Sequence, residues 1–293
     1  MSLHGAATAA HQVDATVAAS SAVMVCLDEP RSCTSAIDRA SELALQLDAG
    51  LHVLSTIDGE DDRKARRQRC TMSDLLHEAS VVLVRHPRLT GETRIGSAAA
   101  TAIEAGTELC PSLVVLGDLR HAGATAVTIA DALGVPVLVA RPRSRSERLV
   151  VATDLRRASR PMIAAGRRYI RARGGSFTVL HVAAPAARDE ASGFIPLHDV
   201  APRTLDRAGR ERIAQLRELG EEGPDLAIMI GASGDPGAAI VAYAMDTDTD
   251  VLAVGYAQRA SFGSPPHHTT AEIVDQARCS ILVVPLAREL END

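Results

Sequence analysis

Two kinds of apolar pattern alternate along the chain, and together they predict a mixed α/β fold. Short continuous runs, such as VMVCL (residues 23–27) and LVVA (residues 149–152), predict strands buried on both faces, which is typical of a parallel sheet. After the first run, apolar positions recur with helical spacing: Ile37, Ala40, Leu43, Ala44 and Leu47. Strands that alternate with helices of this length predict right-handed βαβ units.

The same order of elements occurs twice. Residues 21–54 and 148–182 each read as an apolar strand ending in an aspartate (Asp28 or Asp154), a polar turn, an amphipathic helix, a glycine and a second apolar strand. We expect the glycines, Gly50 and Gly174, to end the helices. We therefore predict two tandem domains of the nucleotide-binding α/β type, at residues 21–142 and 143–293, after a disordered tail at residues 1–20.

Each half closes with a last apolar strand, at residues 135–140 and 280–285. Because an uncovered apolar strand edge invites association, we expect these two strands to form the pairing edges. The pattern leaves open whether the two halves pair with each other inside one chain or across a homodimer. The run RPRSRSER at residues 141–148 is the predicted linker between the halves.

Composition excludes several classes of function. Aromatic residues make up only 2% of the chain and tryptophan is absent, so the core must be aliphatic and stacking on single-stranded nucleic acid is disfavoured. A net charge of −6 also disfavours binding to a phosphate backbone. The single lysine, Lys64, lies in a charged run without a glycine loop, which argues against P-loop, Schiff-base and kinase lysine chemistry.

The cysteines and the apolar runs indicate in which cell compartment the protein is expected. The five cysteines are scattered and never spaced as CxxC, so neither a disulfide framework nor a zinc site is indicated. Cys26 and Cys279 are expected to act as small apolar residues of buried strands. No signal-peptide pattern and no apolar stretch of about 20 residues is present in the sequence, and we expect a cytoplasmic protein without membrane insertion.

The order of several short motifs resembles that of the universal stress protein family, and the whole chain resembles a tandem pair of its domains. The motifs are the strand–aspartate openings VCLDEP and VVATDL, the LHV-type second strands, the turn-helix GDPGAAI, the strand VLAVG and the ending TAEIVDQARCSILVVP. The resemblance covers residues 21–140 and 148–286, and the second half matches better. It implies five-stranded, mostly parallel sheets flanked by helices, pairing through the last strands, and a stress-responsive regulatory role without defined catalysis. Some members of the family bind ATP and others do not.

The resemblance also implies where a nucleotide would bind. ATP-binding members carry G-x-x-G and then, after a gap, G-S/T behind the fourth strand, because glycines let backbone N–H groups approach phosphates at a helix N-terminus. In the first half Val135 lies only 18 positions after Gly117, so we expect the phosphate loop to be missing there. Asp28 is then a turn residue or a helix cap.

The second half has a longer segment after Gly255, YAQRASFGSPPHHTTAEIV. Its candidate nucleotide-binding residues, for ATP or AMP, are Asp154, Gly234, Gly255, Arg259, Gly263, Ser264, Thr269 and Thr270. The alternative interpretation is that residues 263–266 form a simple turn and the two threonines cap the next helix. His267 and His268 fit a solvated pair better than a metal site, and His181 is interpreted as a strand residue.

The leading hypothesis is a non-enzymatic tandem universal stress protein, with at most a weak adenine-nucleotide site in the second half and no catalytic or metal-binding residues. Its partners would be the two halves themselves and a regulatory protein that the sequence does not identify. One alternative is a switch that responds to ATP or AMP. The other is a nucleotide-handling enzyme of the same fold, although the sequence has no signature of one.

Overall fold

The structure is a computed structural model, and the regions described below are residues 22–27, 34–57, 88–117, 122–142, 147–154, 159–173, 175–183, 193–196, 225–230, 235–257 and 268–286. The predicted tails at residues 1–20 and 287–293 lie outside these regions. No helix within the described regions is long and apolar enough to cross a membrane.

The strands and helices follow the predicted alternation in both halves. In the first half they are β1 (Ala22–Leu27), α1 (Thr34–Gln46), β2 (Gly50–Ile57), β3 (Leu89–Ile95), α3 (Ala98–Leu109), β4 (Leu113–Leu116), α4 (Ala122–Leu133) and β5 (Val137–Val139). In the second half they are β6 (Arg148–Ala152), α5 (Arg160–Arg173), β7 (Ser176–Ala183), β8 (Gly193–Pro196), β9 (Asp225–Ile230), α7 (Pro236–Asp246), β10 (Val251–Ala257), α8 (His268–Gln276) and β11 (Ser280–Leu286).

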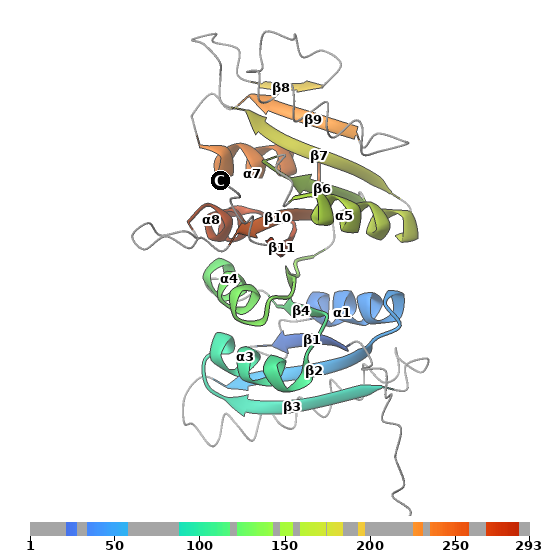
Figure 1. The fold of residues 1–293 in the computed structure, drawn as a ribbon, viewed down its shortest axis with the longest axis vertical. Helices are drawn as coiled ribbons and strands as arrows, with labels where there is room; N and C mark the ends of the chain where they lie inside the picture. The colour runs from blue at the N-terminus through green and yellow to red at the C-terminus, as the bar shows by residue number, and fades with distance from the viewer. Residues whose placement is uncertain are drawn as a thin grey trace, which may run out of the picture.

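All described strands belong to one 11-stranded sheet with the order β3-β2-β1-β4-β5-β11-β10-β6-β7-β9-β8. The first half contributes β3-β2-β1-β4-β5, and the second repeats this order as β9-β7-β6-β10-β11 (Figure 1). The predicted α/β class, a mostly parallel sheet flanked by helices, is therefore confirmed. The second half also has a strand that the pattern did not predict, since β8 pairs antiparallel with β9 at the outer edge.

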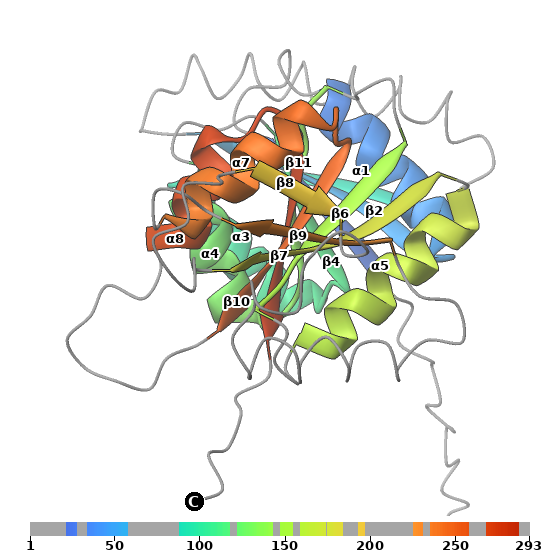
Figure 2. The same cartoon turned by 90° about the horizontal axis from the view of Figure 1, so that it is seen from above.

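Helices cover both faces of the sheet, which explains why the strands read as continuous apolar runs. In β1, Val23, Val25 and Leu27 face a core cluster that includes residues of α1 and α5, whereas Met24 and Cys26 face a second cluster that includes residues of α3, α4, α7 and α8. Figure 2 shows α1 and α5 on one side of the strands and α3, α4, α7 and α8 on the opposite side. Each helix therefore buries one apolar face, as the helical spacing predicted.

The two halves join through their last strands. β5 and β11 are antiparallel, and Leu138 lies opposite Leu282 at the centre of the pairing. Because β5 is parallel to β4 and β11 is parallel to β10, the antiparallel pairing of β5 with β11 relates the halves by an approximate twofold axis. The predicted pairing edges are thus joined within the chain.

Two helices pack closely on one face of this junction, as Figure 1 shows for α4 and α8. A Cβ atom added to Gly123 in α4 would come within 2.2 Å of the carbonyl oxygen of Ala271 in α8, so only glycine permits this approach. The backbone N–H of Gly123 donates a hydrogen bond to Asp275 Oδ1 at 2.9 Å, which satisfies an N–H in the first turn of α4. The second half therefore caps a helix of the first.

Arg141, which was assigned to the linker, is a fixed part of the junction. Its guanidinium donates hydrogen bonds to the carbonyl oxygens of Val274 (2.7 Å) and Cys279 (3.1 Å), at the end of α8 and beyond it. Its backbone N–H donates to Ser280 Oγ at 3.1 Å. Arg148, at the other end of the predicted linker, already belongs to β6, so the linker prediction was too long.

Two details of the first helix also differ from the prediction. Leu47, expected on the buried face, lies beyond the end of α1 and is 50% exposed. Gly50 is the first residue of β2, and the left-handed backbone conformation that follows the helix is adopted by Asp48 instead. The periodic pattern located the helix correctly but extended it by one apolar residue.

The opposite face of the junction contains a buried ion pair. Arg39 in α1 donates a hydrogen bond to Asp250 Oδ1, at the start of β10, and their side chains are only 1% and 7% exposed. The Nε and Nη1 atoms of Arg39 are buried and have no hydrogen-bond partner among the described residues. Asp250 therefore provides the compensating charge for a guanidinium removed from water.

Substitution of Asp250 by Asn should lower the free energy of unfolding by about 3–5 kcal/mol, because it leaves the buried guanidinium of Arg39 without a counter-charge. Replacing Arg39 by Met in the same chain should recover most of this loss. Urea denaturation of the full chain measures both effects. Glu108→Gln, which breaks the exposed pair with Arg94, is the control and should change stability little. Equal losses for Asp250→Asn and Glu108→Gln would contradict this account.

Candidate nucleotide site

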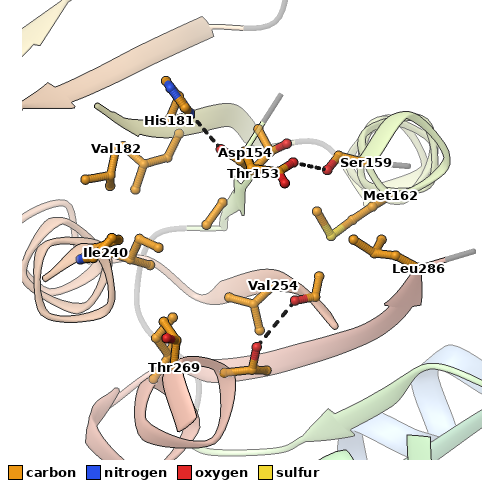
Figure 3. A pocket seen from close by; sticks show the side chains of 16 residues that line it. Thr153, Asp154, Ser159, Met162, His181, Val182, Ile240, Val254, Thr269 and Leu286 are labelled. Atoms are coloured by element: carbon orange, nitrogen blue, oxygen red, sulfur yellow. Dashed lines mark hydrogen bonds between the residues drawn. The ribbon is translucent and has the colours of Figure 1, made fainter. Parts of the chain in front are cut away.

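A pocket of about 310 Å³ lies in the second half, where β6, β7 and β10 end. Figure 3 shows side chains from α5, α7 and α8 surrounding it together with residues of these strands. The carboxyl ends of β6 and β10 are adjacent because these strands are parallel neighbours, with Ala152 paired to Val254. Open α/β sheets bind ligands at this edge, where neighbouring helices leave the sheet in opposite directions.

Apolar side chains form much of the wall of the pocket. Met162, Ile240, Val254 and Leu286 lie around it in Figure 3. Gly255 adjoins Leu286 so closely that a Cβ atom at Gly255 would come within 2.6 Å of Leu286 Cδ1. The glycine thus lets the end of β11 approach β10 and contributes no side chain of its own to the pocket.

Asp154 and Ser159 form one polar corner of the pocket. Asp154 follows β6 and is exposed, whereas Ser159 precedes α5 and is buried. The hydroxyl of Ser159 donates a hydrogen bond to Asp154 Oδ1 at 3.0 Å. This bond orients the carboxylate at the rim of the pocket.

His181 forms a second polar corner, on β7. Its Nδ1 atom lies 2.9 Å from the carbonyl oxygen of Thr153. A carbonyl oxygen can only accept, so Nδ1 must carry the proton. The side chain is half-buried and lines the pocket. Interpreting His181 only as a strand residue missed this placement.

The N-terminal parts of two helices complete the polar surface. Thr269 and Thr270 lie in the first turn of α8, and the hydroxyl of Thr270 donates to the carbonyl oxygen of Gly255 at 3.4 Å. On the other side, Asp235 caps α7, because its Oδ1 atom accepts a hydrogen bond from the backbone N–H of Gly237 at 2.9 Å. Helix N-termini carry partial positive charge, so this side of the pocket suits a negatively charged group.

The structure brings together part of the set predicted from the sequence. Four of its members line this pocket: Asp154, Gly255, Thr269 and Thr270. The others lie outside the described regions: Gly234, Arg259, Gly263 and Ser264. Sequence reasoning missed Ser159 and His181. The strand register could have indicated His181, since Leu180 pairs with Ala152 and therefore places His181 beside Thr153.

The first half has a much shorter connection at the equivalent place. Residues 117–121 link β4 to α4, whereas residues 258–267 link β10 to α8. The short β4–α4 connection agrees with the expectation that the first half has no phosphate loop. Asp28, the counterpart of Asp154, lies outside the described regions.

Tyr256, next to Gly255 in β10, connects this strand to the first half of the chain. Its side chain is buried, and its hydroxyl donates a hydrogen bond to Asp131 Oδ1 of α4 at 3.2 Å. Burial raises the pKa of Tyr256 to about 12, and the negative charge of Asp131 adds to the effect. Asp131 and Asp275 occupy equivalent positions in α4 and α8, and each accepts a hydrogen bond from the opposite half.

The described side chains offer neither a reactive thiol nor a metal site at this edge. Burial raises the pKa of the Cys26 thiol to about 12 and that of Cys279 to about 11, so both stay protonated at neutral pH. Within the described regions, no group of three or more His, Cys, Asp or Glu side chains could hold a metal ion.

Comparisons with known proteins agree with this geometry. The model of the Universal stress protein family matches residues 146–285. A universal stress protein from Archaeoglobus fulgidus DSM 4304 is 14% identical and aligns over 91% of this chain and 96% of its own, with a TM-score of 0.64. A functionally unknown protein, PA1789 from Pseudomonas aeruginosa PAO1, is 19% identical over 90% of this chain and 92% of its own, with a TM-score of 0.62. No curated protein matches the chain.

Residues 146–285 therefore belong to the universal stress protein family, as the sequence predicted. The structural similarities extend the likeness of fold to nearly the whole chain, the first half included.

The hydrogen bond between Tyr256 and Asp131 predicts an alkaline transition. The folded-state pKa of Tyr256 lies above its ordinary value of 10.0, so its contribution to stability is complete below about pH 10 and is lost as the pH rises towards 12. An absorbance titration of the full chain and of Tyr256→Phe should therefore differ by one tyrosine that ionises near pH 12. Asp131→Asn should lower this pKa only in part, because burial is the larger cause. A difference titration centred near pH 10 would contradict the prediction.

Proposed function

We propose that this chain is a non-enzymatic tandem universal stress protein in which the second half binds an adenine nucleotide. The observation that carries the proposal is the pocket at the ends of β6, β7 and β10, with an apolar wall and a polar rim. It lies in the half that matches the family model.

The chemistry of the pocket supports a nucleotide as the ligand. A flat, largely apolar base suits the wall around Met162 and Ile240, and the Asp154 carboxylate is a good acceptor for ribose hydroxyls. Phosphates would lie towards the N-terminus of α8, where Thr269 and Thr270 offer hydroxyl and backbone donors. From the sequence, Arg259, Gly263 and Ser264 would complete the phosphate contacts.

The volume of the pocket helps to choose between ligands. About 310 Å³ is at the lower end of the range of roughly 300–1,000 Å³ for small-molecule sites. This size favours a mononucleotide such as AMP or ATP over a dinucleotide. In the proposal the first half, with its short β4–α4 connection, has a structural or regulatory role.

The hydrogen bonds at the rim support binding in preference to catalysis. In a Ser-His-Asp triad the serine nucleophile would donate its proton to an imidazole. Ser159 instead donates to Asp154, and the Nδ1–H of His181 is directed to the Thr153 carbonyl. These bonds position the side chains for recognition.

The pairing within the chain also bears on partners. β5 lies between β4 and β11, and β11 lies between β10 and β5, so neither strand offers an open edge. We propose that the two halves replace the two subunits of a dimer and that the regulatory partner is a separate protein. A switch that responds to nucleotide is the second candidate function, favoured by the Tyr256–Asp131 bond between β10 and the first half.

Isothermal titration calorimetry of the full chain with AMP and with ATP tests the nucleotide site. We expect one nucleotide per chain, and Asp154→Ala should weaken binding by about 10- to 100-fold, since a hydrogen bond to a charged group contributes about 1.5–3 kcal/mol. The matched control is Asp28→Ala, at the equivalent position of the first half, which should bind like the wild type.

Two outcomes would contradict the proposal. One is the absence of both heat and a shift in melting temperature at millimolar nucleotide. The other is sustained turnover of ATP at ordinary enzymatic rates, which would exclude a purely binding role.

A further inference from the structure

β3 lies at one end of the sheet, and its outer edge has no neighbour among the described strands (Figure 1). The equivalent strand of the second half, β9, does not end the sheet, because β8 pairs with its outer edge in the antiparallel direction. One half therefore has a strand added at the edge where the other has none. Strand edges of this kind present backbone donors and acceptors that can pair with another chain.

The backbone groups at the outer edge of β3 follow from its pairing with β2. The carbonyl oxygen of Arg88 accepts a hydrogen bond from the backbone N–H of Leu51. The backbone N–H of Gly96 donates to the carbonyl oxygen of Ile57. Even-numbered residues thus direct their backbone groups towards β2, and because these directions alternate along a strand, the odd-numbered residues direct theirs outward. The odd-numbered residues of β3 are Leu89, Gly91, Thr93 and Ile95.

β3 itself lacks the devices that commonly protect a strand edge from pairing. It has seven residues, none of them proline or lysine. Its register with β2 runs without a bulge from Leu89 to Ile95. The side chain of Ile95 is 54% exposed, which is unusual for a large apolar residue of this protein. The strand is therefore a suitable template for a further strand.

Two opposite charges lie two residues apart on one face of β3. The Arg94 guanidinium is 2.8 Å from the Glu92 carboxylate and 2.7 Å from that of Glu108 in α3. These contacts hold the charges of Glu92 and Arg94 in place, and both side chains remain partly exposed. An approaching strand would therefore meet one acidic and one basic position on this face.

The charges select one register if the approaching strand is β3 of a second copy. Three symmetric antiparallel registers overlap most of the strand, with their twofold centres at Gly91, Glu92 or Thr93. A centre at Gly91 places Arg94 opposite Arg88, and a centre at Glu92 places two carboxylates opposite each other. Like charges directly opposite are destabilising.

The register centred on Thr93 has complementary partners on both faces. Glu92 then lies opposite Arg94 of the second copy, and Arg94 lies opposite Glu92. The backbone groups of both residues point away from the new strand, so they occupy the closely spaced type of antiparallel pair. On the other face, the exposed Ile95 lies opposite Gly91, which has no side chain to obstruct it.

From these observations we infer that two copies of this chain associate through antiparallel pairing of their β3 strands, centred on Thr93. The pairing would continue the sheet into the second copy, as β8 continues it beyond β9. Because the same strand serves in both copies, the contact is closed and does not propagate into fibres. It uses the edge of the first half that lies away from β5, so it leaves the junction between the halves unchanged.

Sedimentation velocity of the full chain over a range of concentrations tests this inference with charge reversals. Glu92→Arg and Arg94→Glu each place like charges opposite each other twice in the dimer, so each should weaken self-association at least about tenfold. An equimolar mixture of the two variants has opposite charges at both pairs and should dimerise about as tightly as the wild type. The matched control is Glu108→Gln, which removes the other partner of Arg94 from outside the strand and should leave the dimer unchanged.

A second variant tests the backbone pairing. Thr93→Pro removes the outward N–H at the centre of the contact but none of the hydrogen bonds to β2, so it should abolish the dimer and leave the far-UV circular dichroism spectrum unchanged. The inference is overturned if the wild type stays monomeric up to about 0.1 mM, a concentration at which a micromolar dimer would be populated. A dimer that survives Thr93→Pro, or a mixture of folded charge variants that stays monomeric, would overturn it as well.

Discussion

The antiparallel pairing of β5 with β11 sets the geometry of most of the molecule. It places the carboxyl ends of the first-half strands at the same edge of the sheet as the amino ends of the second-half strands. Arg39, near the start of α1, can therefore reach Asp250, which precedes β10, although 211 positions separate the two in the chain. The same arrangement brings α4 against α8 and allows Asp131 and Asp275 to accept hydrogen bonds from opposite halves.

Local sequence pattern was sufficient for much of this fold. Buried strands such as β1 and β6 are continuous apolar runs because helices cover both of their faces, and amphipathic helices show their apolar spacing directly. The pattern did not predict β8, a short edge strand whose place depends on pairing with β9. It also gave no sign that Arg39 is buried, because its counter-charge lies in the run DTDTD, which reads as a solvated turn. Such contacts are set by packing between the halves.

In the candidate site, too, the sequence pattern identified some residues and missed others. Asp154 and Gly255 were identified because they follow buried strands, where parallel sheets bind ligands. Ser159 and His181 were missed, since their roles depend on strand register and on the start of α5, which apolar spacing defines only loosely. Thr269 and Thr270 had two interpretations, as phosphate donors or as helix caps, and the structure is compatible with both, because they lie in the first turn of α8 and line the pocket.

The Arg39–Asp250 pair occurs on one side of the junction and has no copy on the other. In an assembly of two identical subunits, every substitution is made in duplicate, so a large charged pair could not fill one corner and leave its mate empty. When both copies are part of a single polypeptide, a substitution in one copy is not repeated in the other. Each corner can then acquire its own residues, and the connection between β4 and α4 can be shorter than that between β10 and α8, without any change in the symmetry of the shared backbone.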